Sequence, residues 1–209
     1  MTEVEQIKDA LIQGDDRKVR ALTEEALAAG RAPEEILNQG LIAAMEMVGE
    51  RFRTREIFLP DVLLAARAMY AGLDLIKPRL EGGTVPSRGT VVIGTVEGDL
   101  HDIGKNLVGI MLRGAGFNVV DLGNNVAPAA FVEAARSNGA AVVGMSALLT
   151  TTMPVMGRVV SALREAGLAK VKTIVGGAPV SDTFARQIGA DGYGYDAARA
   201  VEMVREWAR

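Results

Sequence analysis

The 209-residue chain contains no cysteine and a single histidine, His101. The lack of cysteine excludes disulfides, thiolate nucleophiles, and zinc or iron–sulfur centres held by thiolates. A single histidine also excludes metal sites that need two imidazole ligands. Any metal must therefore be held by carboxylates or arrive inside a cofactor that needs few protein ligands.

Aromatic residues and charge of one sign are also scarce. Aromatics make up 4% of the chain and apolar residues 49%, which suits helices packed on helices or on a parallel sheet. The net charge is −3 with both signs interspersed, so we expect neither nucleic acid nor a membrane surface as a partner. No apolar run is long enough to span a bilayer, and the acidic, amphipathic amino terminus is unlike a secretion signal. We therefore expect a cytoplasmic protein.

Two segments of different character flank the stretch KPRLEGGTVPSRGT, residues 77–90. This stretch combines proline, glycine and mixed charge without periodicity, which predicts a linker over residues 81–89. Residues 1–80 carry apolar stripes at helical spacing and predict a four-helix bundle. The two short helices that open this segment should end at Gly14 and Gly30, which are placed as C-caps. One stripe consists of Leu37, Leu41, Met45, Val48 and Phe52, and a second of Val62, Ala66, Met69, Leu73, Ile76 and Leu80.

Residues 90–209 alternate short β-branched runs with helical patterns. Near-continuous apolar strands between helices predict an α/β domain with a doubly wound parallel sheet, Rossmann-like or flavodoxin-like. The steps of four between Ile103, Leu107 and Met111 predict a helix after the first strand. The expected strands are 90–96, 117–123, 140–146 and 172–177, and a final helix is expected at 196–208.

The lone histidine lies in the stretch GTVEGDLHDIGKNLVG, residues 94–109, where the first strand leads into a helix. Ligands of open parallel sheets bind at this edge, outside the carboxyl ends of the strands. Asp99 can accept a hydrogen bond from one ring nitrogen of His101 and raise the basicity of the other, as a metal-ligating histidine requires. Gly104 leaves room for a bulky group. The GxGxxG fingerprint of dinucleotide-binding proteins is absent. The alternative to metal ligation is that His101 only caps the helix.

The motif DLHDIGKN resembles the D-x-H-x-x-G signature of cobalamin-binding domains. Ser146 and Leu148 in GMSALLTTTM resemble the S-x-L element of that family, and Gly176 and Gly177 in VGGAPV resemble its paired glycines. Upstream, MEMVGERFRTREIFLPDVLLAARAM resembles the helical cap domain of methionine synthase and of methyltransferase corrinoid proteins. The resemblance covers nearly the whole chain, with residues 1–80 as the cap and 90–209 as the cobalamin-binding domain.

This resemblance implies roles for individual residues. His101 would replace the lower base of cobalamin as the axial ligand of cobalt. Asp99 would hydrogen-bond His101, so that the pair can take up a proton when cobalt is reduced and give it up when the lower ligand is needed again. Ser146 would hydrogen-bond the displaced tail, Thr150 and Thr152 would line the same region, and the glycines would admit the nucleotide. Phe52 and Leu59 match apolar residues that cover the upper face of cobalt, although at helical spacing they could also be core residues. The implied cofactor-binding residues are Asp99, His101, Asp102, Gly104, Ser146, Leu148, Thr150, Thr152, Gly176 and Gly177.

The resemblance also implies a function: a corrinoid protein that carries a methyl group in a Co(I)/methyl-Co(III) cycle of one-carbon metabolism. Its partners would be a substrate-specific methyltransferase, a second methyltransferase with a pterin or thiol acceptor, and a reductive activase. The chain has no cysteines to hold a zinc that activates a thiol, and it is too short to include a (β/α)₈ barrel of about 250 residues. We therefore expect a non-catalytic carrier subunit. The alternatives are a cobalamin-responsive sensor and the small subunit of a carbon-skeleton mutase.

Overall fold

The computed structural model describes residues 2–80 and 86–208, and these fold as two compact units. The first unit comprises residues up to Pro86, and the second contains nearly all residues from Ser87 onward. Most of the predicted linker, residues 81–85, lies outside the described residues. None of the described helices is long and apolar enough to cross a membrane.

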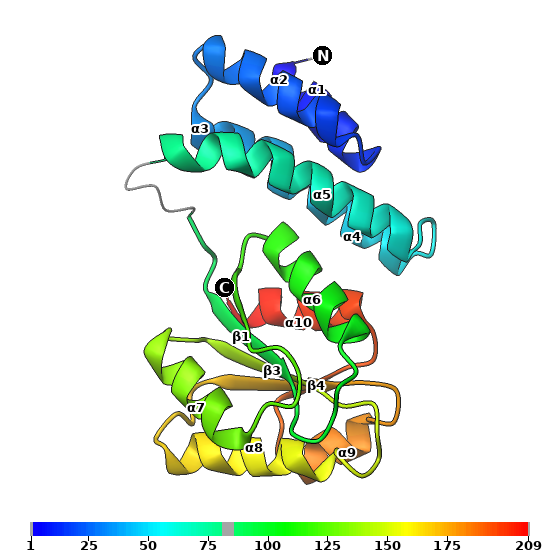
Figure 1. Cartoon of the computed structure of the whole chain (residues 1–209), viewed down its shortest axis with the longest axis vertical. Coiled ribbons are helices and arrows are strands. Elements are labelled where there is room, and N and C mark those ends of the chain that lie inside the picture. Colours follow the sequence, from blue (N-terminus) through cyan, green and yellow to red (C-terminus); the bar gives the residue numbers. More distant parts are fainter. Residues whose placement is uncertain (1, 81–85, 209) are drawn as a thin grey trace. The chain divides into compact units, whose positions relative to one another are not determined.

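The first unit is entirely helical, as predicted (Figure 1). What we predicted as its third helix is interrupted. It starts as a short α-helix, widens into π-helical turns and continues as α4, so that one bundle helix contains three elements. The elements are α1 (Glu3–Ile12), α2 (Asp16–Ala28), α3 (Pro33–Glu35), η1 (Ile36–Ile42), α4 (Ala43–Arg53), α5 (Leu59–Ile76) and the 3₁₀ turn η2 (Lys77–Arg79).

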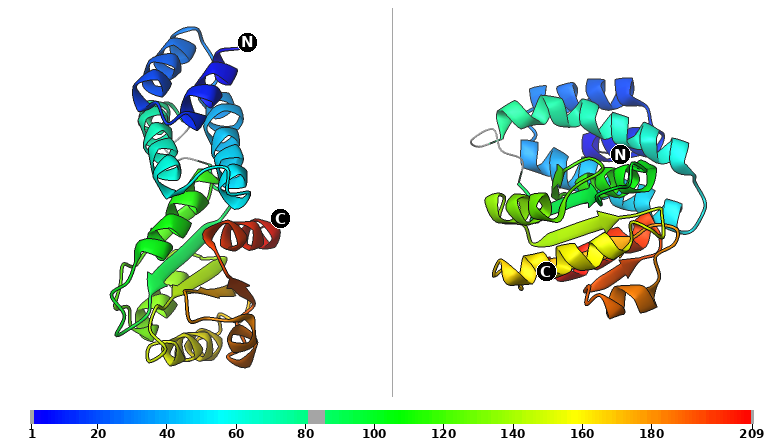
Figure 2. Two further views of the ribbon diagram at one scale, coloured as in Figure 1. Left: turned by 90° about the vertical axis from the view of Figure 1, so that its right-hand side faces the viewer. Right: turned by 60° about the horizontal axis from the view of Figure 1, so that its bottom comes forward.

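The first two helices, drawn in blue in Figure 2, begin and end at residues whose capping interactions explain these positions. Thr2 and Glu5 form a reciprocal capping box at the start of α1. The Asp15 carboxylate accepts a hydrogen bond from Lys18 N at the start of α2. Gly14 and Gly30 follow the two helices with φ angles of 72° and 85°, which confirms both glycines as helix terminators. The predicted apolar stripes face inward, except that Phe52 and Leu73 are only partly buried.

The second unit is a parallel sheet in the order β2-β1-β3-β4-β5, with helices on both faces. This is the strand order of flavodoxin-like folds. The predicted strands are confirmed, but sequence reasoning missed β5, because its three residues Gly-Tyr-Gly contain no β-branched run. The elements are β1 (Thr90–Thr95), α6 (Ile103–Gly114), β2 (Asn118–Asp121), α7 (Pro128–Ser137), β3 (Val142–Ser146), α8 (Pro154–Glu165), β4 (Lys172–Gly176), α9 (Asp182–Gln187), β5 (Gly192–Gly194) and α10 (Ala197–Trp207).

The two faces of this sheet are packed differently. Helices α7, α8 and α9 cover one face over an apolar cluster that includes the fully buried Phe131 (Figure 1). Helices α6 and α10 lie on the other face. There α10 packs closely on β5, since a Cβ on Gly194 would lie 3.0 Å from the Ala200 Cβ. The parallel register aligns Ser146, Gly176 and Gly194 across β3, β4 and β5 at the carboxyl ends of these strands.

Gly177 follows β4 at this edge and tolerates no side chain. Its φ angle is 124°, and a Cβ there would lie 1.9 Å from the Ala147 carbonyl oxygen. We therefore predict that Gly177→Ala lowers the free energy of unfolding of the second unit by more than about 2 kcal/mol. Gly167→Ala is the matched control, because Gly167 also has a positive φ but open space around it, so its cost should be about 1 kcal/mol. Urea unfolding followed by fluorescence of the single tryptophan, Trp207, measures both. Equal costs would contradict this account.

Candidate functional site

The loops that leave β1 and β3 meet at the carboxyl edge of the sheet, because these two strands are neighbours in it. The β1 loop carries Asp99 and His101, and the β3 loop carries Leu148, Leu149 and Thr152. The chain turns to opposite sides of the sheet after neighbouring strands here, which is where ligands of such folds bind.

Asp99 joins the two loops. Its side chain is fully buried, and both carboxylate oxygens accept hydrogen bonds. Oδ1 accepts from the Nδ1 and the backbone N–H of His101, at 2.8 and 3.1 Å. Oδ2 accepts from Leu148 N at 2.8 Å and from Leu149 N at 3.1 Å. The hydroxyl group of the buried Thr152 also lies 2.8 Å from Oδ2.

These hydrogen bonds decide the charge of Asp99. Burial alone raises the pKa of its carboxyl group, because it disfavours the charged form. Hydrogen bonds from Leu148 N–H and from His101, with a smaller one from Thr152, lower that pKa by more. The pKa of Asp99 therefore lies well below its usual value of 3.8, and the side chain is a carboxylate at neutral pH.

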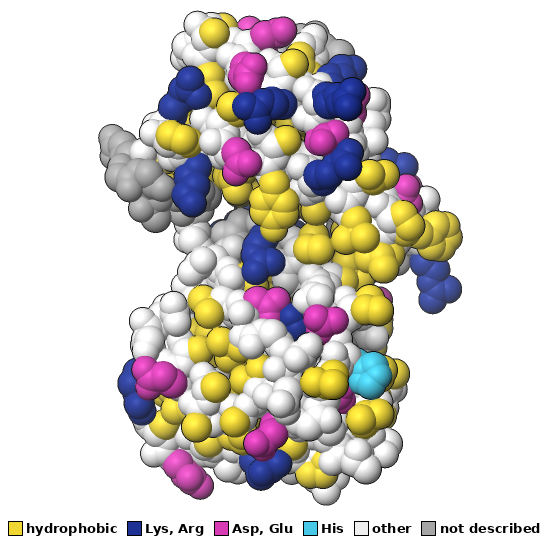
Figure 3. Space-filling view, in the orientation of Figure 1, with side chains coloured by type: hydrophobic (Ala, Val, Ile, Leu, Met, Phe, Trp, Pro, Cys, Tyr) yellow, Lys and Arg dark blue, Asp and Glu magenta, His cyan; other side chains and the backbone are white. Residues whose placement is uncertain are grey.

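The ionised Asp99 sets the orientation and the tautomer of His101. A carboxylate can only accept, so Nδ1 of the imidazole carries the proton of the 2.8 Å hydrogen bond. Nε2 is then left with its lone pair, and no described residue hydrogen-bonds it. The His101 side chain is 52% exposed and lies at the surface of the second unit (Figure 3). An oriented imidazole with a free Nε2 is the arrangement of a metal-ligating histidine.

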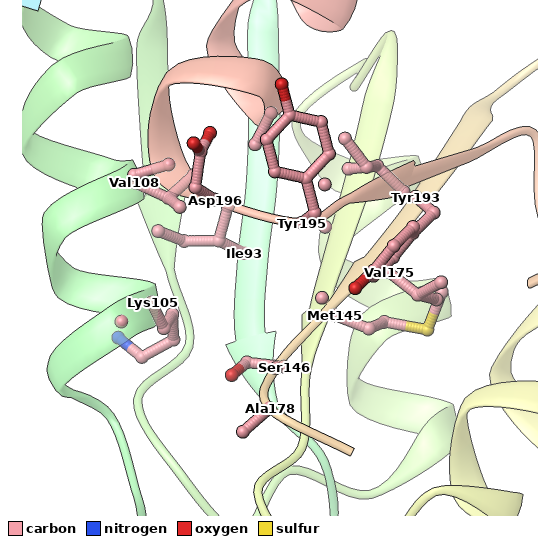
Figure 4. Close-up of a pocket in the computed structure, with 18 residues that line it drawn as sticks. Ile93, Lys105, Val108, Met145, Ser146, Val175, Ala178, Tyr193, Tyr195 and Asp196 are labelled. Carbon is pink, nitrogen blue, oxygen red and sulfur yellow. The ribbon is translucent and has the colours of Figure 1, made fainter. Parts of the chain in front are cut away.

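A cavity of about 380 Å³ opens beside this loop, between α6 and α10 and over the sheet (Figure 4). Its walls include Val108 of α6 and Ala200 of α10. Apart from the chain neighbours and the backbone of the same helix, no atom lies within 4 Å of the place where a Cβ on Gly104 would stand, so this glycine leaves one wall open. The sheet side consists of small or apolar residues, among them Ile93, Gly144, Ser146, Ile174, Gly176 and Gly194.

The residues present fit a corrinoid. His101 and Gly104 are three positions apart, so one molecule with a metal at its centre and a long side arm can reach both the imidazole and the cavity. A row of small residues along the sheet suits a flat aromatic base and its sugar. Large apolar side chains near His101 are exposed: among the described residues of this unit they include Leu100 (68%), Ile103 (75%) and Leu148 (43%). They form an apolar surface of the kind that a flat macrocycle would cover.

The structure brings most of the predicted site residues to this edge. Gly104, Ser146, Gly176 and Gly177 line the cavity. Asp102 is half-buried just before α6, and Leu148 lies in the loop that meets Asp99. Neither Thr150 nor Thr152 lines the cavity: Thr150 is exposed, and Thr152 is buried against Asp99.

Sequence reasoning missed other residues of this region. The stripe that predicted α6 is not buried along its whole length, because Met111 is buried but Ile103 is 75% exposed. The buried residues of this helix also include Lys105, Gly109 and Leu112. Lys105 lines the cavity and is buried because its ammonium group pairs with Asp121, at 2.6 Å. Lysine is usually exposed, so Lys105 near the start of a predicted helix indicates a surface position. The sequence therefore contains no signal that this lysine is buried in an ion pair with Asp121.

Phe52 and Leu59 belong to the first unit. Phe52 is near the end of α4 and Leu59 is the first residue of α5, so the short turn between these helices brings them to the same end of the bundle. Both side chains are half-buried. Phe58, in the turn between them, is 67% exposed. The two residues are therefore not simply interior core residues.

The hydrogen bonds of Asp99 predict a change in stability. An amide in place of this carboxylate would keep one acceptor oxygen but present an NH₂ group to donors, so Asp99→Asn should lower the free energy of unfolding by about 2–4 kcal/mol at pH 7. Since the folded-state pKa of Asp99 is depressed, its contribution is present above about pH 4 and is lost as the pH falls below that value. The deficit of the variant should therefore shrink at about pH 3.

Urea unfolding at both pH values, followed by Trp207 fluorescence, tests this prediction. Asp102→Asn is the matched control, because Asp102 lies in the same loop and its side chain makes no hydrogen bond with the described residues. A deficit in Asp99→Asn that is the same at both pH values would show that the ionised carboxylate does not hold the two loops.

Comparison with known proteins agrees with this site. The B12 binding domain family matches residues 89–202, and a second family, also described as a B12 binding domain, matches residues 3–77. The chain is 48% identical over 201 residues to trimethylamine corrinoid protein 1 of Methanosarcina acetivorans, covering 95% of this chain and 93% of that protein. It is 43% identical over 202 residues to dimethylamine corrinoid protein 3 of the same organism, covering 96% and 94%.

Two solved structures are similar over 99% of the chain. One is a chain in the methanol:cobalamin methyltransferase complex of Methanosarcina barkeri, with 34% identity, 79% of that chain covered and a TM-score of 0.91. The other is a cobalamin-binding protein of Desulfitobacterium hafniense, with 32% identity, 99% of that chain covered and a TM-score of 0.80. The chain therefore belongs to the B12 binding domain family, and its cofactor is cobalamin or a related corrinoid.

Proposed function

We propose that this chain carries a methyl group on the cobalt of a bound corrinoid, between a methyltransferase that supplies it and one that removes it. The observation that carries this proposal is the Asp99–His101 pair, which presents a free Nε2 beside a cavity lined by glycines. A bound corrinoid supplies a cobalt ion that accepts a methyl group in one oxidation state and gives it up in another. The protein supplies ligation, a proton store and a covered site.

His101 is the proposed lower ligand of cobalt, through Nε2. Asp99 accepts the hydrogen bond of the Nδ1 proton, which orients the imidazole and leaves Nε2 as the nitrogen that would bind metal. With a corrinoid bound, the Asp99–His101 pair would be the group that takes up a proton when Nε2 leaves the metal and gives it up when Nε2 binds again.

The cavity is the proposed place for the nucleotide tail of the corrinoid. Ser146 offers the hydroxyl group among the small residues on the sheet side, and Gly176 and Gly194 continue the row beside it. Gly104 keeps the entrance from α6 free of a side chain. In the first unit, we propose Phe52 and Leu59 as residues that cover the upper face of the corrinoid and limit the access of water to the methyl group.

The proposed partners are enzymes. One relative is part of a methyltransferase complex, and this supports a methyltransferase that loads the carrier. Relatives named for trimethylamine and dimethylamine support a methylated amine as the source of the methyl group. We further propose a second methyltransferase with a pterin or thiol acceptor, and a reductive activase that restores cobalt after accidental oxidation.

Loading the purified protein with hydroxocobalamin tests the function. After reduction and addition of a chemical methyl donor, we expect the protein to retain the corrinoid and to show an absorption spectrum that persists in the dark and reverts in light. Release of the corrinoid on gel filtration, or a spectrum insensitive to light, would contradict the proposed carrier function.

Replacing His101 tests the ligand. His101→Ala should still bind hydroxocobalamin, because the cavity is intact, but with affinity lowered at least about tenfold. Its spectrum should lose the signature of histidine ligation. The control is Lys170→Ala, which changes an exposed residue before β4, at the opposite edge of the sheet. A His101→Ala spectrum identical to that of the unmodified protein would rule out His101 as the lower ligand.

A further inference from the structure

The segment between β2 and α7 runs beside the loop that carries Asp99 and His101. Backbone hydrogen bonds join them: Thr95 N donates to Gly123 O at 2.9 Å, and Val126 N donates to Thr95 O at 3.0 Å. Val96 and Val126 also form a parallel bridge. This segment therefore continues the pairing of β1 and β2 up to the point where the histidine loop begins.

Asn125 occupies a special place in this segment. It has a φ angle of 54°, in the left-handed region that asparagine tolerates better than most residues other than glycine. Its side-chain Oδ1 accepts a hydrogen bond from Gly98 N at 2.8 Å. Its backbone N–H donates to Asp99 O at 2.9 Å. One residue thus holds the backbone on both sides of the Gly98–Asp99 peptide.

The other residues of the loop are held in the same way. Asn124 Nδ2 lies 3.4 Å from Leu100 O, and the buried Thr95 hydroxyl donates to His101 O at 3.0 Å. Each residue from 98 to 101 therefore has one backbone group fixed from outside the loop. The carboxylate of Asp99 is fixed separately, by the β3 loop.

We infer that Asn125 is a positioning residue for cobalt ligation: it fixes the backbone of the histidine loop so that Asp99 Oδ1 meets His101 Nδ1. This inference rests on the proposed function, since it concerns the same ligand. Asp99 and His101 are two positions apart, and the 2.8 Å contact between their side chains requires that the backbone of each residue is correctly placed. If Oδ1 of Asn125 is removed, Gly98 is released and Asp99 can shift relative to the imidazole.

The side-chain chemistry of Asn125 gives a set of matched variants. Asn125→Gly keeps the left-handed backbone but removes the acceptor for Gly98. Asn125→Asp keeps an acceptor oxygen of the same reach and serves as the rescue variant. Asn138→Gly is the control, because the Asn138 side chain bonds the Ala134 carbonyl at the end of α7, within the same unit but not in the histidine loop.

The first readout needs no cofactor. Since His101 is the only histidine, ¹⁵N spectra of histidine-labelled protein report its imidazole alone, and the two nitrogen shifts reveal which nitrogen carries the proton. With the imidazole neutral, we expect the Nδ1–H tautomer in the unmodified protein. Asn125→Gly should lower the ratio of the Nδ1–H to the Nε2–H tautomer about two- to tenfold, the effect of one hydrogen bond. Asn125→Asp should restore it, and Asn138→Gly should not change it.

The second readout is the spectrum of protein loaded with hydroxocobalamin. The ratio of histidine-ligated to unligated corrinoid should fall in Asn125→Gly by a similar factor and recover in Asn125→Asp. Unchanged tautomer and ligation ratios in Asn125→Gly, with only a lower unfolding free energy, would overturn the inference and leave Asn125 a structural residue.

If Asn125→Gly does not fold, Asn125→Ser serves instead, since its hydroxyl group is too short to span the contact to Gly98. The same two ratios then decide the outcome. A failure of the proposed function would be recognised differently: the unmodified protein would not retain a corrinoid, whatever the tautomer of His101.

Discussion

The buried carboxylate of Asp99 is the group on which the site depends. It accepts hydrogen bonds from two loops that are far apart in the sequence, and it does so while fully buried. A charge in that position is stable only because donors surround it, so any movement of either loop would leave the charge unpaired. The orientation of His101 thus follows from the requirement to satisfy Asp99.

The fold makes this arrangement possible. Parallel strands β1 and β3 are neighbours and end at the same edge, so their loops meet without long connections. The same strand order leaves α6 and α10 on one face, with a cavity between them over small or apolar residues of the sheet. His101 and the cavity therefore lie at one edge of one unit, where a single elongated cofactor can reach both.

Much of this could be predicted from the sequence, because local patterns encode it. The helical stripes and the β-branched runs are formed by residues close together in the sequence, and the fold that they predict was confirmed. The spacing of Asp99, His101 and Gly104 is likewise a local pattern. Strand β5 was missed because two of its three residues are glycine. The exposure of Ile103 could not be predicted from its spacing, because steps of four indicate a helix without deciding how far each residue is buried.

Contacts between distant segments could not be predicted in this way. Thr152 bonds Asp99 across 53 positions, Lys105 pairs with Asp121 across 16, and Asn125 bonds Gly98 across 27. No residue pattern near any of these side chains indicates its partner. The register of neighbouring strands and the paths of their loops bring the partners together, and these are properties of the folded sheet.

The central claim is that the imidazole of His101 replaces the corrinoid base beneath cobalt. Electron paramagnetic resonance of the loaded protein in the Co(II) state tests it most directly, with unlabelled and with ¹⁵N-labelled histidine. Because the chain has one histidine, the label marks His101 alone. The account predicts that each cobalt line is a triplet with ¹⁴N and becomes a doublet with the label. Triplets that persist with the label would show that the nitrogen belongs to the corrinoid base, and would contradict the account.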